Sequence, residues 1–237
     1  MEIYRKTYTL KSKDVDMFRK LRISRLFEML QEAAIAHTEE LGCRRDKTLD
    51  KGFLWIVTQQ SLTISRLPEY DETFTLESWP GDTMHVLFPR YYRLVHESGE
   101  VLMEGSSLWT LVDEKTRRFI FPDKNGIVIP GTPTDHDPAL PARLPSVKNP
   151  DLESEFRVPF SYCDLNSHMN NTRYFDIALD DADLSWHRRK LVSVVSEYVS
   201  EATYGDVLQI LKEETGDSLL FEGKKEKTVF KMRFIFA

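Results

Sequence analysis

The sequence predicts an α+β fold in which a unit made of one helix and an antiparallel sheet occurs twice. Three observations predict it: a proline-rich break in the middle of the chain, the same order of elements on both sides of that break, and residue matches at a constant spacing. The chain has 237 residues, of which 41% are hydrophobic, and this is enough for one large core or two small ones.

The break spans residues 130–150, which contain six of the eleven prolines of the chain. Proline lacks a backbone N–H and resists helix formation, so this stretch should be an extended linker. We therefore predict a first repeat over residues 1–129, a linker over residues 130–150 and a second repeat over residues 151–237.

The first unit starts with a strand-like segment at residues 1–10, where polar and apolar residues alternate. A helix is predicted from Ser24, a suitable N-cap, to Gly42, where the helical spacing of apolar residues stops. Strand-like runs follow at residues 53–64, 73–79, 88–96 and 101–112.

The second unit shows the same order. A short segment at residues 156–162 precedes a helix predicted over residues 171–185, with Tyr174 and Leu184 on its apolar face. Strand-like runs then follow at residues 191–199, 207–213, 219–222 and 228–236.

The two units also match residue by residue, as expected of a duplication. A shift of 148 positions aligns four pairs and a shift of 134 aligns two more: Asp16 with Asp164, Arg25 with Arg173, Phe27 with Phe175, Glu28 with Asp176, Tyr70 with Tyr204 and Glu72 with Asp206. The difference between the shifts corresponds to a longer loop between helix and sheet in the first unit.

Composition excludes several classes of function. The formal net charge of -6 and the short, scattered basic clusters exclude nucleic acid as a partner, although one such cluster could dock an acidic carrier protein. No stretch is long and apolar enough to insert into a membrane, and the N-terminus has no signal-peptide core. Cys43 and Cys163 lie far apart, which predicts no disulfide and no metal site. We expect a cytoplasmic protein.

The segment from Ser161 to Tyr174 carries many polar residues directly before an apolar helix. If it is extended, Asp164, Asn166 and His168 project to one side, and a carboxylate, an amide and an imidazole share one site. The alternative is structural: residues 170–172 suit helix capping, and the Asp and His would only satisfy backbone donors.

Glu201 is a second candidate, because it ends a largely apolar strand, where a carboxylate is costly unless it is paired. A surface position at the strand end is the alternative. The first unit lacks this polar set. Its aligned residues are Phe18 for Asn166, Lys20 for His168 and Leu67 for Glu201. The site is therefore predicted in the second unit alone.

Over nearly the whole chain, the sequence resembles the acyl carrier protein thioesterases, bacterial relatives of the plant plastid enzymes that end fatty acid synthesis. The resemblance rests on five stretches: 30–37, 54–58, 107–109 with 115–118, the Asp-Leu-Asn-Ser-His-Met-Asn-Asn motif at 164–171, and 198–201 leading to 206–209. The Asp-x-Asn-x-His-x-Asn-Asn motif followed by a Glu is specific for that family.

The resemblance implies a double hot-dog fold, in which two tandem repeats each wrap a sheet around a long helix. It also implies that the first repeat supplies much of the acyl pocket and that the second supplies the catalytic residues Asp164, Asn166, His168 and Glu201. Candidate substrate-binding residues are Asn171, Met29, Trp55 and Val57, although the spacing of the last three is also typical of core residues.

The implied activity is hydrolysis of the thioester in fatty acyl-acyl carrier protein, which releases free fatty acid without any cofactor. Many plant members have a cysteine directly after the glutamate, but Ala202 stands here, so a thiolate mechanism from that position is excluded. We expect Glu201 or Asp164 to activate water, His168 and Asn166 to orient it, and an N–H at the start of the 171–185 helix to polarise the carbonyl.

Three rival functions stay open from the sequence: a hot-dog thioesterase acting on acyl-coenzyme A, a hydroxyacyl dehydratase, and a non-catalytic acyl-binding module. Acyl chain length cannot be derived, because it depends on how the pocket residues pack. Open sheet edges could also pair two copies of the chain as a homodimer.

Overall fold

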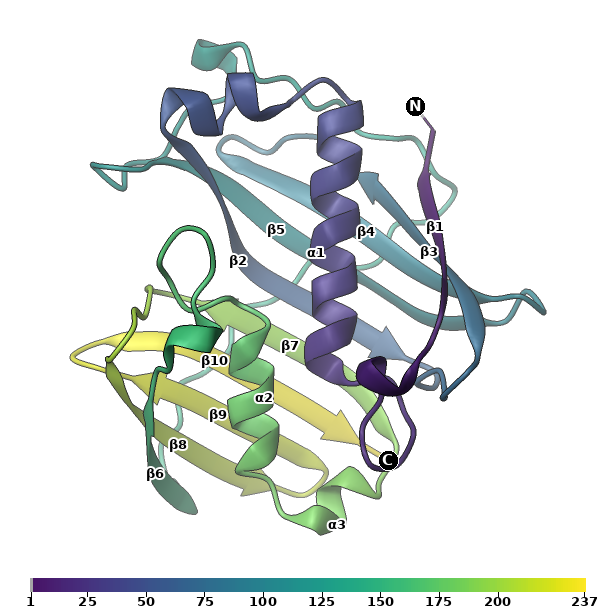
Figure 1. Cartoon of the computed structure of the whole chain (residues 1–237), viewed down its shortest axis with the longest axis vertical. Coiled ribbons are helices and arrows are strands. Elements are labelled where there is room, and N and C mark those ends of the chain that lie inside the picture. The colour runs from purple at the N-terminus through teal and green to yellow at the C-terminus, as the bar shows by residue number, and fades with distance from the viewer. Residues whose placement is uncertain (1) are drawn as a thin grey trace.

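The computed structural model describes residues 2–237, within which ten strands form one continuous antiparallel sheet (Figure 1). The strands of the first repeat are β1 (Tyr4–Thr9), β2 (Phe53–Ile64), β3 (Thr73–Pro80), β4 (Leu87–His96) and β5 (Val101–Asp113). Those of the second repeat are β6 (Leu152–Arg157), β7 (Leu191–Tyr198), β8 (Val207–Thr215), β9 (Ser218–Lys224) and β10 (Thr228–Phe236). The helices are α1 (Ile23–Glu40), α2 (Arg173–Asp180) and α3 (Leu184–His187), with short 3-10 turns that include η1 (Ser12–Asp14), η2 (Arg45–Lys47), η3 (Leu49–Lys51), η4 (Asp123–Asn125) and η5 (Phe160–Tyr162).

The order of strands in the sheet reveals the duplication. It runs β1-β3-β4-β5-β2 and then β7-β10-β9-β8-β6, so the second half mirrors the first. The two repeats join where β2 pairs with β7, from Gln59 opposite Glu197 to Thr63 opposite Ser193. Each repeat is a hot-dog unit, and a pseudo-two-fold axis between them relates one to the other.

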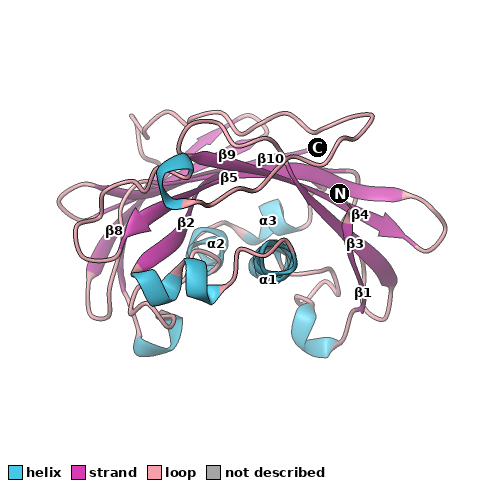
Figure 2. Ribbon diagram, turned by 90° about the horizontal axis from the view of Figure 1, so that it is seen from above, coloured by secondary structure: helices cyan, strands magenta, loops and turns pink. Residues whose placement is uncertain are grey.

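Both long helices lie on the concave face of the curved sheet (Figure 2). α1 buries one stripe of apolar residues against the first half of the sheet, as its helical spacing predicts. α1 and α2 meet through Phe27 and Phe175, whose stacked rings have centroids 4.0 Å apart. These aligned residues are both fully buried, and one hydrophobic core runs through the two repeats.

The proline-rich residues 130–150 contain no helix or strand, and they cross the convex face of the sheet. Asp137 Oδ1 accepts a hydrogen bond from Trp79 Nε1 on β3, and the carbonyl of Ala139 accepts one from Ser106 Oγ on β5. Further along, the N–H of Val147 donates to Glu222 on β9. The linker thereby covers polar and aromatic side chains that the sheet would otherwise leave in solvent.

Most predicted elements lie within two residues of their observed bounds, but two differ. The segment predicted at residues 156–162 is strand β6 four residues earlier, followed by the turn η5, and the second helix is shorter than predicted. Residues 171–185 do not form one helix, because α2 ends at Asp180 and a separate turn, α3, begins at Leu184. Asp183 starts that turn by accepting a hydrogen bond from the N–H of Ser185 through its carboxylate. Leu184, predicted on the apolar face, is consequently exposed.

A bulge in β2 creates space beside the sheet. The pairing of β2 with β5 shifts register between Val57 and Gln59, and Thr58 donates from its hydroxyl to the carbonyl of Leu108. β7 pairs with β2 only beyond this bulge. Residues 53–57 therefore have no strand partner from the second repeat, and a loop of that repeat lies there instead.

Candidate active site

That loop, which we call the Asp164 loop (residues 163–169), is a tight turn rather than the extended stretch that the sequence suggested. The N–H of Asp164 donates to the carbonyl of His168, and the N–H of Ser167 donates back to Asp164. Ser167 adopts a left-handed backbone with φ of 63°. The simple alternation of side chains predicted for Asp164, Asn166 and His168 is thus wrong, because local hydrogen bonds close the segment into a turn.

The first repeat contains the same turn, the Asp16 loop (residues 15–21). Arg19 takes the left-handed place of Ser167 with φ of 64°, and the N–H of Asp16 donates to the carbonyl of Lys20. In both loops the aspartate Oδ1 accepts the N–H of the residue two positions later, at 2.8 Å. The shared geometry confirms the alignment by 148 positions and shows that one task of this aspartate is to hold the turn.

Three polar side chains converge beside the Asp164 loop. His168 Nε2 lies 3.2 Å from Glu201 Oε2, and Arg117 Nη2 lies 3.2 Å from both of these atoms. His168 and Glu201 come together because His168 forms an antiparallel bridge with Thr203 and the N–H of Met169 donates to the carbonyl of Ala202, the residue after Glu201. Arg117 reaches them from the first repeat, in the turn after β5.

This triangle gives His168 two alternative hydrogen-bonding states. Nε2 donates to Glu201 when it carries a proton, and it accepts from Arg117 when it does not. Glu201 can accept from Arg117 in either state. The imidazole is therefore held in place while its proton is free to move, which suits a group that handles protons during a reaction.

An apolar cavity of about 230 Å³ lies between α1 and the concave face of the first half of the sheet. Its main apolar walls are Leu54, Trp55, Phe88, Trp109 and Ile129. Polar residues of both repeats line it as well: Asp164, Asn166 and Asn170 from the second, and Gln31, Thr38, Glu39, Arg45, Thr48 and Arg90 from the first. Leu165, at the tip of the loop, lines the same cavity and is 84% exposed. The Asp164 loop of the second repeat thus reaches a cavity whose apolar walls belong to the first.

Of the four predicted substrate-binding residues, one lines the apolar cavity. Trp55 lines the apolar cavity, whereas Met29 and Val57 are fully buried in the core and Asn171 contributes only its carbonyl, as an acceptor for Tyr198. The position next to it, Asn170, lines the cavity instead. Helical and strand periodicity identifies such residues as buried, but not which of them meet an empty space.

Asn170 bears on the prediction that a backbone N–H at the start of α2 polarises the substrate carbonyl. Its Oδ1 accepts the N–H of Thr172 and its carbonyl accepts the N–H of Arg173, so these two backbone donors are already occupied. The amide Nδ2 of Asn170 forms no hydrogen bond among the described residues. Asn166 and Asn170 both line the cavity, so their side-chain amides are candidate donors there.

Arg117 is the site residue that sequence reasoning missed. The available signal was its place in one of the short basic clusters, which we considered only as a possible docking patch for an acidic carrier protein. Its backbone is left-handed, with φ of 56°, an uncommon conformation for a residue other than glycine. Only the packing of one repeat against the other shows that this side chain reaches Glu201.

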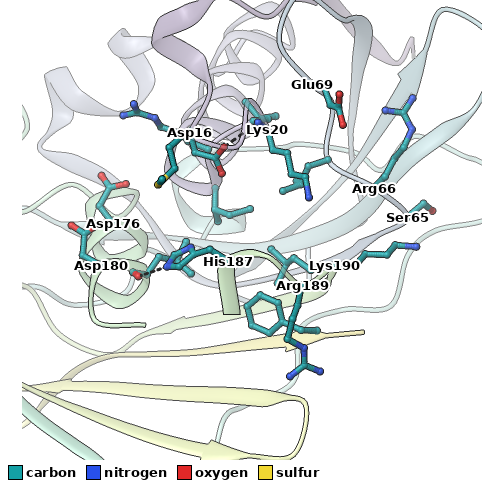
Figure 3. Close-up of a pocket in the computed structure, with 18 of the residues that line it drawn as sticks. Asp16, Lys20, Ser65, Arg66, Glu69, Asp176, Asp180, His187, Arg189 and Lys190 are labelled. Carbon is teal, nitrogen blue, oxygen red and sulfur yellow. Dashed lines mark hydrogen bonds between the residues drawn. The ribbon is translucent and has the colours of Figure 1, made fainter. Parts of the chain in front are cut away.

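A second, larger cavity of about 730 Å³ is the pseudo-symmetric counterpart of the first, and we call it the charged cavity. Figure 3 shows Asp16 and Lys20 on one side of it and His187, Arg189 and Lys190 on the other. Leu67, the residue aligned with Glu201, also lines it. It keeps the aspartate turn but holds neither the histidine nor the glutamate, so the two repeats differ in chemistry although they share a backbone.

Among residues 2–237, no helix is both long and apolar enough to pass through a lipid bilayer. The described residues also contain no cluster of three or more His, Cys, Asp or Glu side chains placed to hold a metal ion.

Comparison with known proteins gives agreeing results for both halves of the chain. Residues 1–122 match the acyl-ACP thioesterase N-terminal domain, and residues 146–235 match the acyl-ACP thioesterase C-terminal domain. A chloroplastic palmitoyl-acyl carrier protein thioesterase of Arabidopsis thaliana is 26% identical over 231 residues, which cover 90% of this chain and 56% of that protein. The chain spans somewhat over half the length of the curated relatives it matches.

Solved structures show the same fold. An acyl-ACP thioesterase from Bacteroides thetaiotaomicron superposes with a TM-score of 0.88 at 20% identity, covering 99% of this chain and 98% of the other. A 12:0-ACP thioesterase from Umbellularia californica gives a TM-score of 0.87 at 21% identity, covering 99% and 97%. With both family domains matched in order along one double hot-dog sheet, the chain belongs to the acyl-ACP thioesterase family.

Proposed function

We propose that this protein hydrolyses the thioester of a fatty acyl group carried on acyl carrier protein, releases the free fatty acid and so ends fatty acid synthesis. The observation that carries the proposal is the apolar cavity of the first repeat, which opens on Asp164 and Asn166 of the loop that also holds His168. In this division of labour, residues 1–129 provide the acyl pocket, residues 130–150 connect the repeats, and residues 151–237 provide the catalytic groups.

The reaction needs one base and a few hydrogen-bond donors, because a thiolate is a good leaving group. A carboxylate takes a proton from water while the water oxygen bonds to the carbonyl carbon. The amides of Asn166 and Asn170 donate to the oxyanion that forms. The C–S bond then breaks, the carbonyl re-forms, and the leaving thiolate takes up the proton from the site.

Asp164 is the better placed of the two carboxylates for accepting this proton. It lines the apolar cavity, and only its Oδ1 is engaged with the backbone. Glu201 does not line the cavity, and it faces the cation of Arg117 at 3.2 Å. We therefore assign Glu201 the role of holding His168, and Asp164 the direct contact with water and substrate.

The substrate assignment is tested with matched thioesters. Acyl carrier protein and coenzyme A present the same phosphopantetheine arm, so octanoyl, dodecanoyl and palmitoyl groups on each carrier separate recognition of the protein from recognition of the chain. We expect free thiol to be released fastest from an acyl carrier protein ester. Preference for coenzyme A esters would favour the rival thioesterase, hydration of an enoyl thioester would favour a dehydratase, and binding without turnover would favour an acyl-binding module.

Arg117 should act as a positioning residue for this reaction. Replacing it with alanine removes a charged hydrogen bond to Glu201, and we expect kcat to fall about 10-fold with little change in KM. Arg117→Lys, or added guanidinium with Arg117→Ala, should restore part of the rate. The matched control is Arg118→Ala, because that neighbouring arginine is exposed. An unchanged kcat in Arg117→Ala would remove this role.

The proposed setting is the cytoplasm, where Cys43 and Cys163 would stay reduced, as they are unpaired here. A homodimer would have to use the outer strands of the sheet, β1 and β6. Both are six residues long and carry exposed charges such as Arg5 and Glu153, which oppose pairing of edges. Light scattering would measure whether two copies associate.

A further inference from the structure

Three charged residues of the first repeat line the apolar cavity, Glu39, Arg45 and Arg90, and Arg90 is the one buried between α1 and the sheet. Arg90 lies on β4, points to the concave face and is only 4% exposed. Its guanidinium donates from Nη1 to His37 Nδ1 and Ser78 Oγ, both at 3.1 Å, and from Nη2 to Thr38 Oγ1 at 3.0 Å. Arg90 and Thr38 both line the cavity.

All three of these partners are neutral. Burial and the adjacent Arg90 lower the pKa of His37 to about 4, so its imidazole is uncharged at neutral pH. Burial also lowers the pKa of Arg90, to about 10, which leaves the guanidinium cationic under the same conditions. Among the described residues the hydrogen-bond partners of Arg90 include no carboxylate and it forms no ion pair, although Glu39 lines the same cavity. A buried charge without a counter-ion is strongly unfavourable.

Two donors of the guanidinium are also unused. Nη1 donates both of its hydrogens and Nη2 donates one. Nε–H and one Nη2–H therefore have no partner among residues 2–237. These two nitrogens form the edge of an arginine side chain that receives a carboxylate through two parallel hydrogen bonds. The missing partner therefore has the chemistry of a carboxylate rather than of a methyl group.

The position of Arg90 in the cavity says where such a carboxylate would be. The Asp164 loop lies beside the start of β2, whereas Arg90 lies two strands further on, on β4, and is level with Gln60, so it is displaced from the loop both across the sheet and along the strands. Between the two ends lie the side chains of Trp55, Trp109 and Phe88. The cavity thus carries the reacting loop on one side of its apolar walls and the buried cation of Arg90 on the other, with Glu39 and Arg45 as further charged lining residues.

We propose that the preferred acyl group carries a carboxylate at its far end, so that the substrate is an ω-carboxyacyl thioester with Arg90 as its counter-ion. This inference rests on the proposed thioesterase activity and specifies its substrate class. Arg90 binds the distal carboxylate, while the thioester lies against the Asp164 loop and is hydrolysed as described above. Ser78, Thr38 and His37 hold the guanidinium in place when the cavity is empty.

The first test compares dodecanoyl and ω-carboxyundecanoyl groups on the same acyl carrier protein, with the unmodified chain as enzyme. We expect kcat/KM to favour the ω-carboxy substrate about 10-fold, the contribution of a hydrogen bond between charged groups. Shorter and longer pairs, octanoyl to palmitoyl, locate the length at which the preference is greatest. Faster hydrolysis of the methyl-ended substrate at every length would overturn the inference and leave the thioesterase function standing.

Variants at position 90 test whether Arg90 is the counter-ion. Arg90→Leu should lose the preference and hydrolyse the methyl-ended substrate at least as well, whereas Arg90→Lys should keep part of it. Arg93→Leu is the matched control, since Arg93 lies on the same strand but pairs with Glu104. If Arg90→Leu folds, as judged by its circular dichroism, and still prefers the ω-carboxy substrate, Arg90 is not the counter-ion.

A binding measurement keeps the inference testable without turnover. Calorimetry with the free acids should show dodecanedioate binding about 10-fold more tightly than dodecanoate at neutral pH. Equal affinities would overturn the proposed role of Arg90, whichever thioesters are hydrolysed. Failure to hydrolyse any thioester, together with tighter binding of the diacid, would instead defeat the proposed function and keep the anion site.

Discussion

Asp164→Asn is expected to lower kcat about 10²- to 10⁴-fold, the usual loss when a general base is removed. The substitution leaves the turn intact, because an asparagine Oδ1 can accept the N–H of Asn166 as the aspartate does at 2.8 Å. What disappears is the carboxylate that faces the apolar cavity. Steady-state hydrolysis of an acyl-acyl carrier protein substrate, with KM measured in parallel, gives the result directly.

The Asp16 loop supplies the control for this experiment. Asp16→Asn makes the same change in the same backbone turn of the other repeat, and we expect it to leave kcat unchanged. Glu201→Gln should cost less than Asp164→Asn, since Glu201 acts through His168. The reverse order of losses would move the base to Glu201, and full activity in His168→Ala would reject the site. Single turnover in oxygen-18 water, followed by mass measurement of peptides with Asp164, would show label only if this carboxylate attacks covalently.

Phe175→Ala should destabilise the fold by about 3–5 kcal/mol, the usual cost of removing a buried aromatic ring. Phe175 is 0% exposed, and its ring stacks on Phe27 at the pseudo-two-fold axis where α1 meets α2. The ring of Phe175 also packs near Phe234 of β10, so the cavity that the substitution leaves is lined by apolar side chains and water does not fill it. Urea unfolding followed by tryptophan fluorescence measures the change in the free energy of unfolding.

Phe160→Ala is the matched control, because Phe160 is the same residue type but 81% exposed. We expect its free energy of unfolding to stay within about 0.5 kcal/mol of the starting value. If Phe175→Ala lowers the free energy of unfolding no more than Phe160→Ala does, the contact between α1 and α2 contributes little to joining the repeats.

Much of the fold could be read from the chain because its signals are local. Alternation of polar and apolar residues located β2 and β10, and helical spacing located α1, although the helix begins at Ile23, one residue before the predicted cap Ser24. The second helix was predicted too long, because apolar spacing continues through residue 184 while the segment 180–183, which holds three aspartates, ends α2 and starts α3. Periodicity records which side chains are apolar, but not where the backbone turns.

Prediction of the site was less complete, since it depends on contacts between distant segments. Asp164, Asn166, His168 and Glu201 were predicted because they are polar residues in unusual places of the second unit, and the last three of them align with Phe18, Lys20 and Leu67 in the first. Asn170 was mistaken for a cap alone, and Arg117 for surface, because neither residue is unusual in its own segment. Their roles appear only where the two repeats meet.

By itself, the sequence determined the duplication, the family resemblance and the inequality of the two repeats, because each of these is a comparison of residues along one chain. The tertiary structure alone decided which residues share a space: Arg117 with His168 and Glu201, and Arg90 with the cavity that ends at Asp164. The physical reason is that charge and burial act through distance in space. The sequence alone does not distinguish a basic residue that water surrounds from one that lines an apolar cavity.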